Sequence, residues 1–597
     1  MRDYSGLKNA ADKLAIACLA AMLIIPFLHP RHYQPIGSFW PEWWAVALGL
    51  ATATLLMTRN AAWRPLQLPS VTAIPLLLCL VAAAQIASGH VQFVQQGLLY
   101  ASMMIWAALM MIVGHRLTAT RGLGFLADIM ASALLAGALA NSLVQLLQLQ
   151  QAGFASGLVF QGGGLSLGGN LAQVNHFNHQ IWLGIASLLY AHAHKKCNIP
   201  LTSAGALILV TASTLSTSKS AFAYSFVFAL LAWAVSRLNR SSSELVRLRF
   251  SAAMLLVLVV AMQGLYMLLR SHGLFDSLGT SAPERFFFDG GGFATRWMIW
   301  KKAGFIFLAH PWFGSGIGSF PLNYYLTSEA IPPGSLPGVA EHAHNLPLQL
   351  LVELGAVPVV LIGWLLWRWF RTFLTGSWSA ERWWAVAVLA VGALHSMLEY
   401  PLWYAYFLGI AAMLMGATDK AVAYGRMADR GVTLMAGIAV VGATILALVR
   451  HDFEIIELRV NPRLSAVSTS AAASTTAMTD LDELRRNSIL APYAYYALSF
   501  VIALSSQAIE QKIAICRMAQ KFYPDRAVVF KCAALTALSG RRDEALTEMR
   551  RALYAFPDLA GGVVNELEPY KQRYPQLAPL QALARDFASK QASGSGP

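Results

Sequence analysis

AAMLLVLVVAMQGLYMLL, residues 252–269, contains no charged side chain and is long enough to cross a bilayer. A membrane-spanning helix needs about 17–25 mostly apolar residues. Comparable stretches begin near Leu14, Trp43, Ser70, Val94, Gly124, Asn175, Pro200, Lys219, Leu346, Trp383, Leu402 and Val432. We therefore predict an all-α, polytopic membrane protein of about 13 transmembrane helices.

The composition of the whole chain agrees with this fold class. Of 597 residues, 56% are hydrophobic and only 12% are charged, whereas soluble proteins have about 25% charged residues. The five cysteines are scattered and form no CxxC metal motif. Cys516 and Cys532 could pair if their segment is extracytoplasmic, or they could be two separate core cysteines.

The distribution of cations orients the predicted spans. Lys and Arg gather in alternate connections, so the formal charge of +14 reflects topology rather than a nucleic-acid partner. The connections poor in cations, which are expected on the opposite side, lie around Tyr33, Gly162, Ser216, Pro283 and Pro401. An odd number of spans places the segment after Arg450 on that same, extracytoplasmic side.

The chain divides into three regions by composition. Residues 1–450 are predicted to be the transmembrane domain, including a large extracytoplasmic loop at 271–343. Residues 451–480 contain a Ser/Ala/Thr-rich stretch typical of a linker. Residues 481–590 have helical spacing, and Tyr523-Pro524-Asp525 recurs as Phe556-Pro557-Asp558, close to the period of about 34 residues of tetratricopeptide (TPR) repeats. A soluble TPR-like domain is predicted there, with a plain helical bundle as the alternative.

The end of the large loop carries two histidines, in Glu341-His342-Ala343-His344-Asn345. Asn345 can cap a helix that opens with Leu346 and Pro347. The positive end of that helix favours a neutral imidazole, so His344 is a candidate base. His342 offers the same chemistry, and the alternative is a histidine that only hydrogen-bonds a loop carbonyl.

Two cations on the outward-facing side are candidates for binding an anion. Lys219 follows the turn Ser216-Thr217-Ser218, and Arg296 lies in Phe293-Ala294-Thr295-Arg296-Trp297, with the outward cations Lys301 and Lys302 following. A cation kept outside against the orientation rule usually has an anionic partner, and pyrophosphate suits both groups. The alternatives are an ion pair with Asp289 or Glu341, or a lipid headgroup.

Polar residues also gather where other spans begin or end, and buried polar groups in a membrane mark either sites or helix packing. They are Gln173, Asn175, His176 and His179 on one span, and His395, Glu399, Tyr400, Trp403 and Tyr404 on another. We predict no metal, because no thiolate or dense carboxylate set completes a coordination shell.

Six motifs together give the chain a family resemblance. They are His29-Pro-Arg-His-Tyr-Gln-Pro35 with Phe39 and Glu42-Trp43, Gly169-Asn-Leu-Ala-Gln173-Val-Asn175-His176, Arg296-Trp-Met-Ile-Trp300, His310-Pro-Trp-Phe-Gly-Ser-Gly-Ile-Gly-Ser-Phe320, His344-Asn345 with Leu351-Val-Glu353-Leu-Gly355, and His395-Ser-Met-Leu-Glu399-Tyr400-Pro-Leu-Trp-Tyr404. From about His29 to Met415 the chain resembles the bacterial O-oligosaccharyltransferases of the PglL type, or pilin O-ligases, within the Wzy/WaaL superfamily of O-antigen polymerases and ligases.

This resemblance implies transfer of a glycan from undecaprenyl-pyrophosphate to Ser or Thr of exported proteins such as pilins, at the periplasmic face of the inner membrane and without a cofactor. The family's essential loop histidine falls on His344, and its polar span-end residues fall on Gln173 and Tyr400. The basic residue after the Ser/Thr turn is commonly arginine in the superfamily but is Lys219 here, which lacks the bidentate fork.

The residues and the resemblance lead to one functional prediction. His344 acts as base, assisted by Tyr400 and Gln173, while substrate-binding side chains hold the donor and the acceptor. The substrate-binding candidates are Arg296, Lys219, Asn175, His176, His342, His395, Glu399 and Tyr404. The alternatives are a ligase or polymerase acting on lipid A–core or glycan acceptors, and a lipid or solute transporter.

Overall fold

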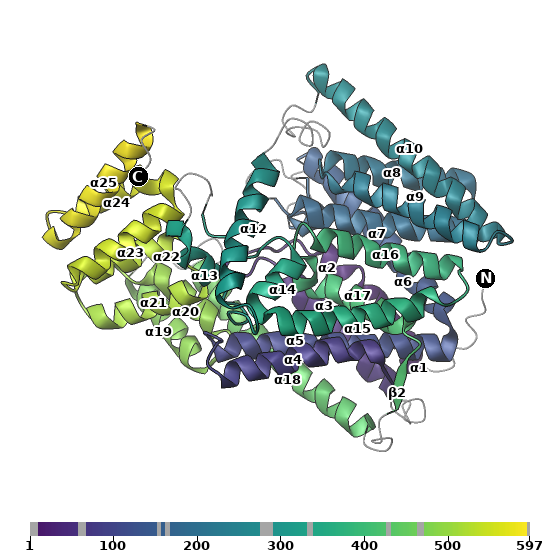
Figure 1. Ribbon diagram of the computed structural model, residues 1–597, viewed down its shortest axis with the longest axis horizontal. Coiled ribbons are helices and arrows are strands. Elements are labelled where there is room, and N and C mark those ends of the chain that lie inside the picture. The colour runs from purple at the N-terminus through teal and green to yellow at the C-terminus, as the bar shows by residue number, and fades with distance from the viewer. Residues whose placement is uncertain are drawn as a thin grey trace. The chain divides into compact units, whose positions relative to one another are not determined.

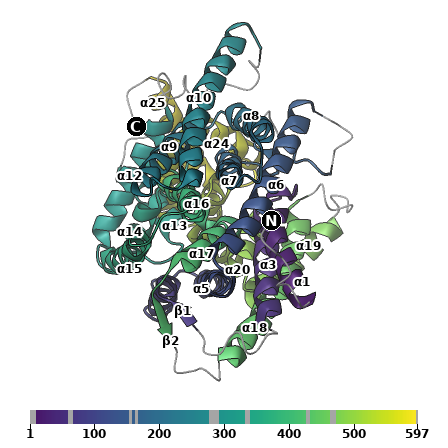
Figure 2. The same ribbon diagram turned by 90° about the vertical axis from the view of Figure 1, so that its right-hand side faces the viewer.

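The computed structural model describes residues 10–57, 67–151, 157–161, 167–274, 291–330, 338–424, 431–461 and 471–593. Helices make up most of these residues, which confirms the predicted all-α class. Within them, one short antiparallel pairing joins β1 (Gln67–Pro69) to β2 (Val422–Tyr424), seen near the foot of Figure 2.

Among the described residues, seven helical stretches are long and apolar enough to cross a membrane. They are α1 with α2 (Ala10–Leu28), η3 with α4 (Ser70–Ala87), α5 (Val94–Arg121), α6 (Leu123–Leu149), α9 (Ser220–Leu238), α10 (Ser243–Ser271) and the part of α18 at Thr433–Val460. These stretches confirm a multi-pass membrane protein but not thirteen spans.

The other predicted spans form shorter or more polar helices. Two are short and apolar, α8 (Ile199–Leu215) and α17 (Ala405–Thr418). The others are α3 (Phe39–Met57), α7 (Val174–Ala193) and α16 (Ala380–Ser396). The stretch predicted to span from Leu346 is broken instead: α14 (Leu346–Leu354) ends at Gly355, whose φ of +82° stops the helix, and α15 (Ala356–Leu374) begins after it.

The chain folds into two compact units, each built from separate segments. Unit 1 contains residues 1–76, 103–290 and 362–446. Its central helix is α7, which packs against α6, α8, α10 and α16 (Figure 1). Every residue of α7 from His176 to Tyr190 is buried, so the start of this helix lies in a protein interior.

Unit 1 also contains a very close approach between helices α5 and α17. A Cβ atom on Gly416 would lie 1.9 Å from the Met111 carbonyl oxygen, and one on Gly114 would lie 2.0 Å from that of Met413. Only glycine lets two backbones come so near, as in other membrane helix pairs.

Unit 2 contains residues 77–102, 291–361 and 447–597. The loop segment supplies α12 (Gly291–Ala309), α13 (Phe320–Leu326) and α14. The C-terminal segment supplies α19 (Ala471–Asn487), α20 (Ala491–Val501), α21 (Ile509–Phe522), α22 (Arg526–Leu538), α23 (Arg542–Ala555), α24 (Ala560–Leu567) and α25 (Ala578–Ala592).

The predicted linker at 451–480 is helical at both ends. The long helix α18 (Gly431–Val460) continues into it, and α19 begins at Ala471, while residues 462–470 lie outside the described part. Phe453 and Ile456 are completely buried, and Arg459 forms an ion pair with Asp480 at 2.6 Å. Apolar and charged contacts therefore stabilise helix where composition predicted a flexible chain.

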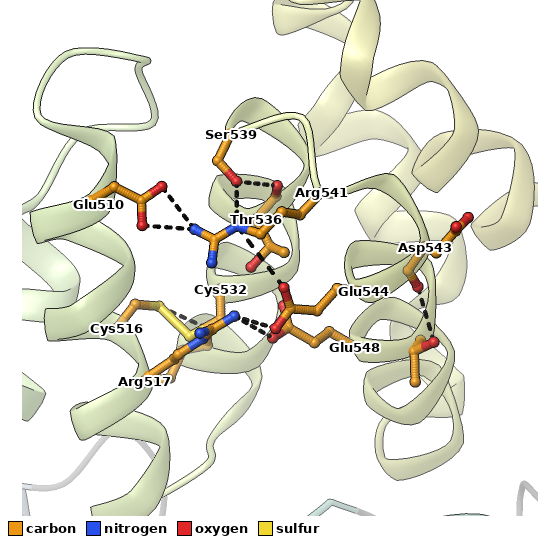
Figure 3. Close-up of polar contacts among 12 residues, drawn as sticks. Glu510, Cys516, Arg517, Cys532, Thr536, Ser539, Arg541, Asp543, Glu544 and Glu548 are labelled. Carbon is orange, nitrogen blue, oxygen red and sulfur yellow. Dashed lines mark hydrogen bonds and ion pairs between the residues drawn. A yellow bond between two sulfur atoms is a disulfide. The ribbon is translucent and has the colours of Figure 1, made fainter.

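The C-terminal helices pack as successive pairs, and a disulfide joins two of them. Cys516 on α21 bonds to Cys532 on α22, with their Cα atoms 5.6 Å apart (Figure 3). The repeated Pro-Asp motif has two different structures. Asp525 caps α22 by accepting a hydrogen bond from the Val528 amide, whereas Pro557–Leu559 forms a 3₁₀ turn before α24. A helical domain is present, but a TPR repeat is not confirmed.

The loop segment and the helical domain of unit 2 share apolar contacts. Tyr325, next to the end of α13, belongs to the buried core formed by α22 to α25. Val339 packs against both this core and the separate loop core that contains Ala343. Glu329 also lies 3.4 Å from the Arg551 guanidinium. The segment that carries the two loop histidines is thus packed on the helical domain.

Candidate functional site

The start of α7 holds a network of polar side chains within unit 1. The Gln173 side chain caps the helix by accepting a hydrogen bond from the His176 amide at 2.7 Å. Asn175 donates to Glu399 at 3.1 Å and accepts from the Ser218 hydroxyl at 2.9 Å. Glu399 is almost fully buried, with 5% of its surface exposed. Residues from three separate segments therefore meet here.

The turn between α8 and α9 belongs to the same network. Ser218 and Ser220 lie 2.9 Å apart through their hydroxyl oxygens, and Asn178 donates to Ser220 at 2.8 Å. Thr217 has a φ of +55°, an unusual value for a β-branched residue. Lys219 lies between these two serines, at the N-terminus of α9. The backbone around Lys219 is therefore fixed by hydrogen bonds to α7.

Three histidines pack together beside this network. His179 and His395 are hydrogen-bonded through their Nδ1 atoms at 2.9 Å, so one ring donates and the other accepts. The His176 ring contacts His395 with 5.5 Å between ring centroids and Tyr404 with 4.6 Å. Tyr400 stacks on Tyr404 at 5.9 Å. The Nε2 atom of His176 is buried and has no hydrogen-bond partner in the described part of the chain.

The His344 loop lies in unit 2 and is fixed on both sides of the histidine. Before it, the Trp300 indole donates to the Ala343 carbonyl at 3.0 Å, and the Ala343 amide donates to the Gln349 side chain at 2.7 Å. After it, the Asn345 side chain accepts from the Leu348 amide at 3.0 Å, as the sequence predicted. His344 is half-buried and has a φ of +49°. Non-glycine residues in this left-handed region cluster at functional sites.

Arg296 and Trp300 lie four residues apart on α12. Residues at this spacing share a face of a helix, so Arg296 lies on the side of α12 that contacts the His344 loop. Lys302, which follows closely, points into the interior instead: it is 3% exposed and its ammonium lies 4.2 Å from the Tyr324 ring centroid. Burial lowers the pKa of Lys302 to about 8.

A glycine-rich turn supports the end of α14. Gly314 and Gly316 have φ values of +74° and +106°, and a Cβ on either would lie 2.3 Å or less from backbone atoms. The Ser315 and Gly316 amides donate to the last carbonyls of α14, those of Val352 and Glu353. Gln85, which is buried, donates to the Glu353 carbonyl at 2.8 Å. This motif therefore has a structural role that ends α14 and holds it in place.

The predicted site residues fall into two groups. Unit 1 brings together Gln173, Asn175, His176, Lys219, His395, Glu399, Tyr400 and Tyr404, and unit 2 contains Arg296, His342 and His344. Within the described residues, no group of three His, Cys, Asp or Glu side chains is arranged to hold a metal ion.

Sequence reasoning missed a second polar network, which is centred on Asn170. The side-chain amide of Asn170 donates to the Leu28 carbonyl at 2.7 Å, and its backbone NH donates to the side-chain oxygen of Asn141 at 2.9 Å. His32 lies 2.6 Å from the Asn170 carbonyl oxygen. One signal could have revealed it: Asn141, Gln145 and Gln148 repeat at helical spacing on one face of α6, an unusual pattern inside an apolar span.

Comparison with known proteins adds two family matches and one relative. The O-Antigen ligase family matches residues 204–362, and the family described as the C-terminal part of virulence factor membrane-bound polymerases matches residues 383–563. A General O-oligosaccharyltransferase from Acinetobacter baylyi is 25% identical over 469 residues, which cover 76% of this chain and 78% of the relative. The first match includes Lys219, Arg296 and His344, and the second includes His395 and Tyr400.

Proposed function

We propose that this chain transfers a lipid-linked glycan to hydroxyl groups of proteins. The proposal is supported by its resemblance to the PglL-type O-oligosaccharyltransferases of the O-antigen ligase and polymerase superfamily. The chain is a glycosyltransferase by this similarity. The donor would be an undecaprenyl-pyrophosphate glycan. The acceptor would be Ser or Thr of an exported, pilin-like protein at the periplasmic face of the inner membrane.

In the proposed reaction, the acceptor oxygen displaces the lipid pyrophosphate in one step. His344 takes the proton of the Ser or Thr hydroxyl as its oxygen bonds to the anomeric carbon of the sugar. The bond between that carbon and the pyrophosphate oxygen breaks, and the lipid pyrophosphate leaves with the electron pair. A single displacement inverts the anomeric configuration. Proton transfer of this kind contributes typically about 10²–10⁴-fold in rate.

The fixed backbone of His344 is the observation that carries this proposal. Three hydrogen bonds hold its neighbours Ala343 and Asn345, and its left-handed φ persists only because the surroundings impose it. A histidine that merely filled space would not need this arrangement. His344 is only half-buried, so we expect a substrate hydroxyl to reach it.

The two cations would stabilise the leaving pyrophosphate. Arg296 offers a planar fork that suits a phosphate group, and Lys219 offers a compact charge. The polar network at the start of α7 would hold substrate hydroxyl and amide groups through Gln173, Asn175 and Tyr400, which are half-buried and therefore partly open to a substrate. His176, His395, Glu399 and Tyr404 would complete this binding surface, and His342 would be a secondary contact.

The disulfide supports the proposed orientation of the helical domain. Disulfides form and persist in oxidising compartments and are rare in the cytosol. The bond between Cys516 and Cys532 therefore favours a periplasmic location for residues 471–593.

A second candidate is transfer to lipid A–core or to another glycan, which the two family matches favour. The same base and the same leaving group would serve, and only the acceptor would differ. The transporter alternative has no such support, because the similar proteins are enzymes.

An acceptor competition decides between the two. The purified protein in detergent is incubated with an undecaprenyl-pyrophosphate glycan and, in parallel, with a pilin-like protein, with lipid A–core, or with free glycan. A mass increase of one glycan on the pilin supports the proposal. Transfer only to lipid A–core, or chain extension of the glycan alone, would replace it with the second candidate.

A further inference from the structure

Helix α12 carries apolar side chains on its outer face as well as in its core. Its exposed residues follow a helical stripe, with Trp297 49%, Phe305 55% and Leu308 71% exposed. Its inner face is apolar too, with Ala303 fully buried in the loop core, and Lys302 beside it is only 3% exposed. A surface helix in water has an apolar inner face but mostly polar and charged side chains on its outer face. The medium around the outer face of α12 is therefore not expected to be water.

The exposed apolar surface continues past the end of α12. Trp312 and Phe313 are 66% and 67% exposed. The turn that carries them is bonded to the first residues of α15: the Ala356 amide donates to the Pro311 carbonyl at 2.8 Å, and the Val357 amide donates to that of Trp312 at 3.2 Å.

Helix α15 carries the same surface further. Its first turns expose Val357 at 40%, Val360 at 69% and Leu361 at 44%. The stripe on α12, the turn and the start of α15 therefore form one outer face, which we call the α12 face. Patches this continuous mark protein or membrane contacts.

The side chains of the α12 face suit lipid better than a protein partner. Trp is enriched at the membrane–water boundary, and helices that lie in this boundary carry Trp, Phe and Leu on their apolar face. Lys301 is the one basic side chain of the stripe, and its ammonium lies 5.9 Å from the Trp297 ring centroid. Long basic side chains at such positions reach toward lipid headgroups while their stems stay in apolar surroundings.

We propose that α12 lies in the membrane interface, with the α12 face inserted among lipid acyl chains rather than crossing the bilayer. Helices of this kind bury their apolar face about 5–10 Å into the boundary between headgroups and acyl chains. Because Trp300 of the same helix bonds the residue before His344, this docking holds the histidine loop at the membrane surface. The inference rests on the packing of α12 and α15 and does not depend on which acceptor is used.

Depth-dependent quenching of a fluorophore tests this proposal. Cys18, Cys79 and Cys197 are replaced by serine, while the disulfide between Cys516 and Cys532 is kept. A new cysteine, Leu308→Cys or in a second variant Phe305→Cys, is labelled with an environment-sensitive dye. The full-length protein is then placed in phosphatidylethanolamine and phosphatidylglycerol vesicles. The matched control is Thr547→Cys on the exposed face of α23.

The proposal expects spin-labelled lipids to quench the Leu308 label several-fold more than the Thr547 label. Spin labels near the headgroup should quench more than those at the chain end, and aqueous iodide should quench only the control. Iodide quenching equal to the control would show a water-facing helix. Protection from both quenchers would show a protein partner or a second copy. Strongest quenching at the chain end would show a spanning helix. Each of these three results would overturn the proposal, whether or not the protein transfers glycans.

Discussion

At the scale of single residues, His344 combines an unusual backbone with fixed neighbours. Its φ of +49° and the bonds to Ala343 and Asn345 fix the backbone from which the imidazole projects. His344→Ala should therefore lose at least about 10²-fold in transfer rate, because general-base catalysis disappears. Intact-mass measurement of a glycosylated acceptor reports the rate.

His342→Ala is the matched control for this substitution. It removes a histidine two residues away and should keep most of the activity. A normal rate in His344→Ala together with a loss in His342→Ala would transfer the role of base to His342. Circular dichroism should show unchanged helix content in both variants.

Gln173 caps a helix, so its substitutions must separate this structural role from a role in binding substrate. Its side-chain oxygen caps α7, which leaves its amide NH₂ available to donate to a substrate. Gln173→Ser keeps a good cap but removes this donor, so we expect a higher KM or a lower kcat at unchanged stability. Gln173→Ala should in addition lose about 1 kcal/mol of stability. Kinetics at varied donor concentration measure KM and kcat of each variant. Full activity in Gln173→Ser would show that Gln173 acts only as a helix cap.

Lys302 makes the stability of unit 2 depend on pH. Burial lowers its pKa from 10.5 to about 8, so between these values the unfolded chain binds more protons than the folded one. The free energy of unfolding should therefore rise as pH increases through this window. Lys302→Met lacks this dependence and at about pH 7 should be more stable than wild type by up to about 3 kcal/mol. Thermal melts of wild type and Lys302→Met at about pH 7 and about pH 9 test this. Equal changes of melting temperature with pH in the two proteins would contradict it.

Local sequence predicted helix capping better than it predicted contacts between distant segments. Asn345 was predicted as a cap and is one, because the cap depends on local sequence alone. Lys302 was grouped with outward cations but is buried against Tyr324, since the face of a helix that meets its neighbours depends on tertiary packing. The same limit hid Asn170, whose partners are 29 and 142 residues away in the sequence.

At the scale of elements, the glycine-rich turn after α12 controls where α14 ends. At Gly316 the φ is +106° and a Cβ would lie 2.2 Å from the His90 carbonyl oxygen. Gly316→Ala should therefore lower the free energy of unfolding by roughly 2 kcal/mol or more.

Gly304→Ala is the control, because a Cβ at that position in α12 meets nothing within 4 Å. It should stabilise the helix by about 0.5–1 kcal/mol. Thermal melts of the two variants should move in opposite directions. Equal effects would mean that the turn tolerates a side chain.

Sequence periodicity located the elements but not all their interruptions. The spans near Val94, Gly124 and Lys219 became α5, α6 and α9 because long apolar runs dictate helix in a membrane. The break at Gly355 was missed, since Leu346 to Leu374 reads as one mainly apolar stretch interrupted by Gln349, Glu353 and two late arginines. The break becomes apparent only in the structure, where the backbone amides of Ser315 and Gly316 donate hydrogen bonds to carbonyl groups at the end of α14.

At the scale of the whole molecule, the disulfide should stabilise the helical domain and indicate on which side of the membrane this domain lies. Replacing Cys516 and Cys532 with serine opens a loop of the kind that contributes about 3 kcal/mol, so the helical domain should unfold at a lower temperature. Neighbouring ion pairs, such as that of Arg541 before α23 with Glu510 on α21 at 2.9 Å (Figure 3), remain in place. A variant that melts like wild type would contradict this contribution.

The same cysteines test orientation in intact cells. If residues 471–593 are periplasmic, Cys516 and Cys532 should resist a thiol-reactive polymer until a reductant is added. Cys197, in the cation-rich connection predicted to be cytoplasmic, should react only after the membrane is opened. Immediate labelling of Cys516 in lysed but unreduced cells would argue against an oxidising location.

Composition predicted a membrane domain followed by a helical domain, but the compact units follow a different division. The segment 291–361 belongs with the C-terminal helices rather than with the flanking spans. Tyr325 and Val339 make this association, and neither residue stands out among the many apolar residues of the chain. Which apolar side chains meet across hundreds of residues is decided by packing, which one sequence does not display.

The shared packing at Val339 limits how this enzyme could be recombined with its relatives. The loop core and the core of the helical domain both bury part of this side chain, and Glu329 pairs with Arg551 across the same contact. A chimaera that exchanged only the C-terminal helices would combine surfaces that had not evolved together. Acceptor preference should therefore pass between homologues only when residues 291–361 and 447–593 come from the same parent, so that the two segments are inherited as one exchangeable module.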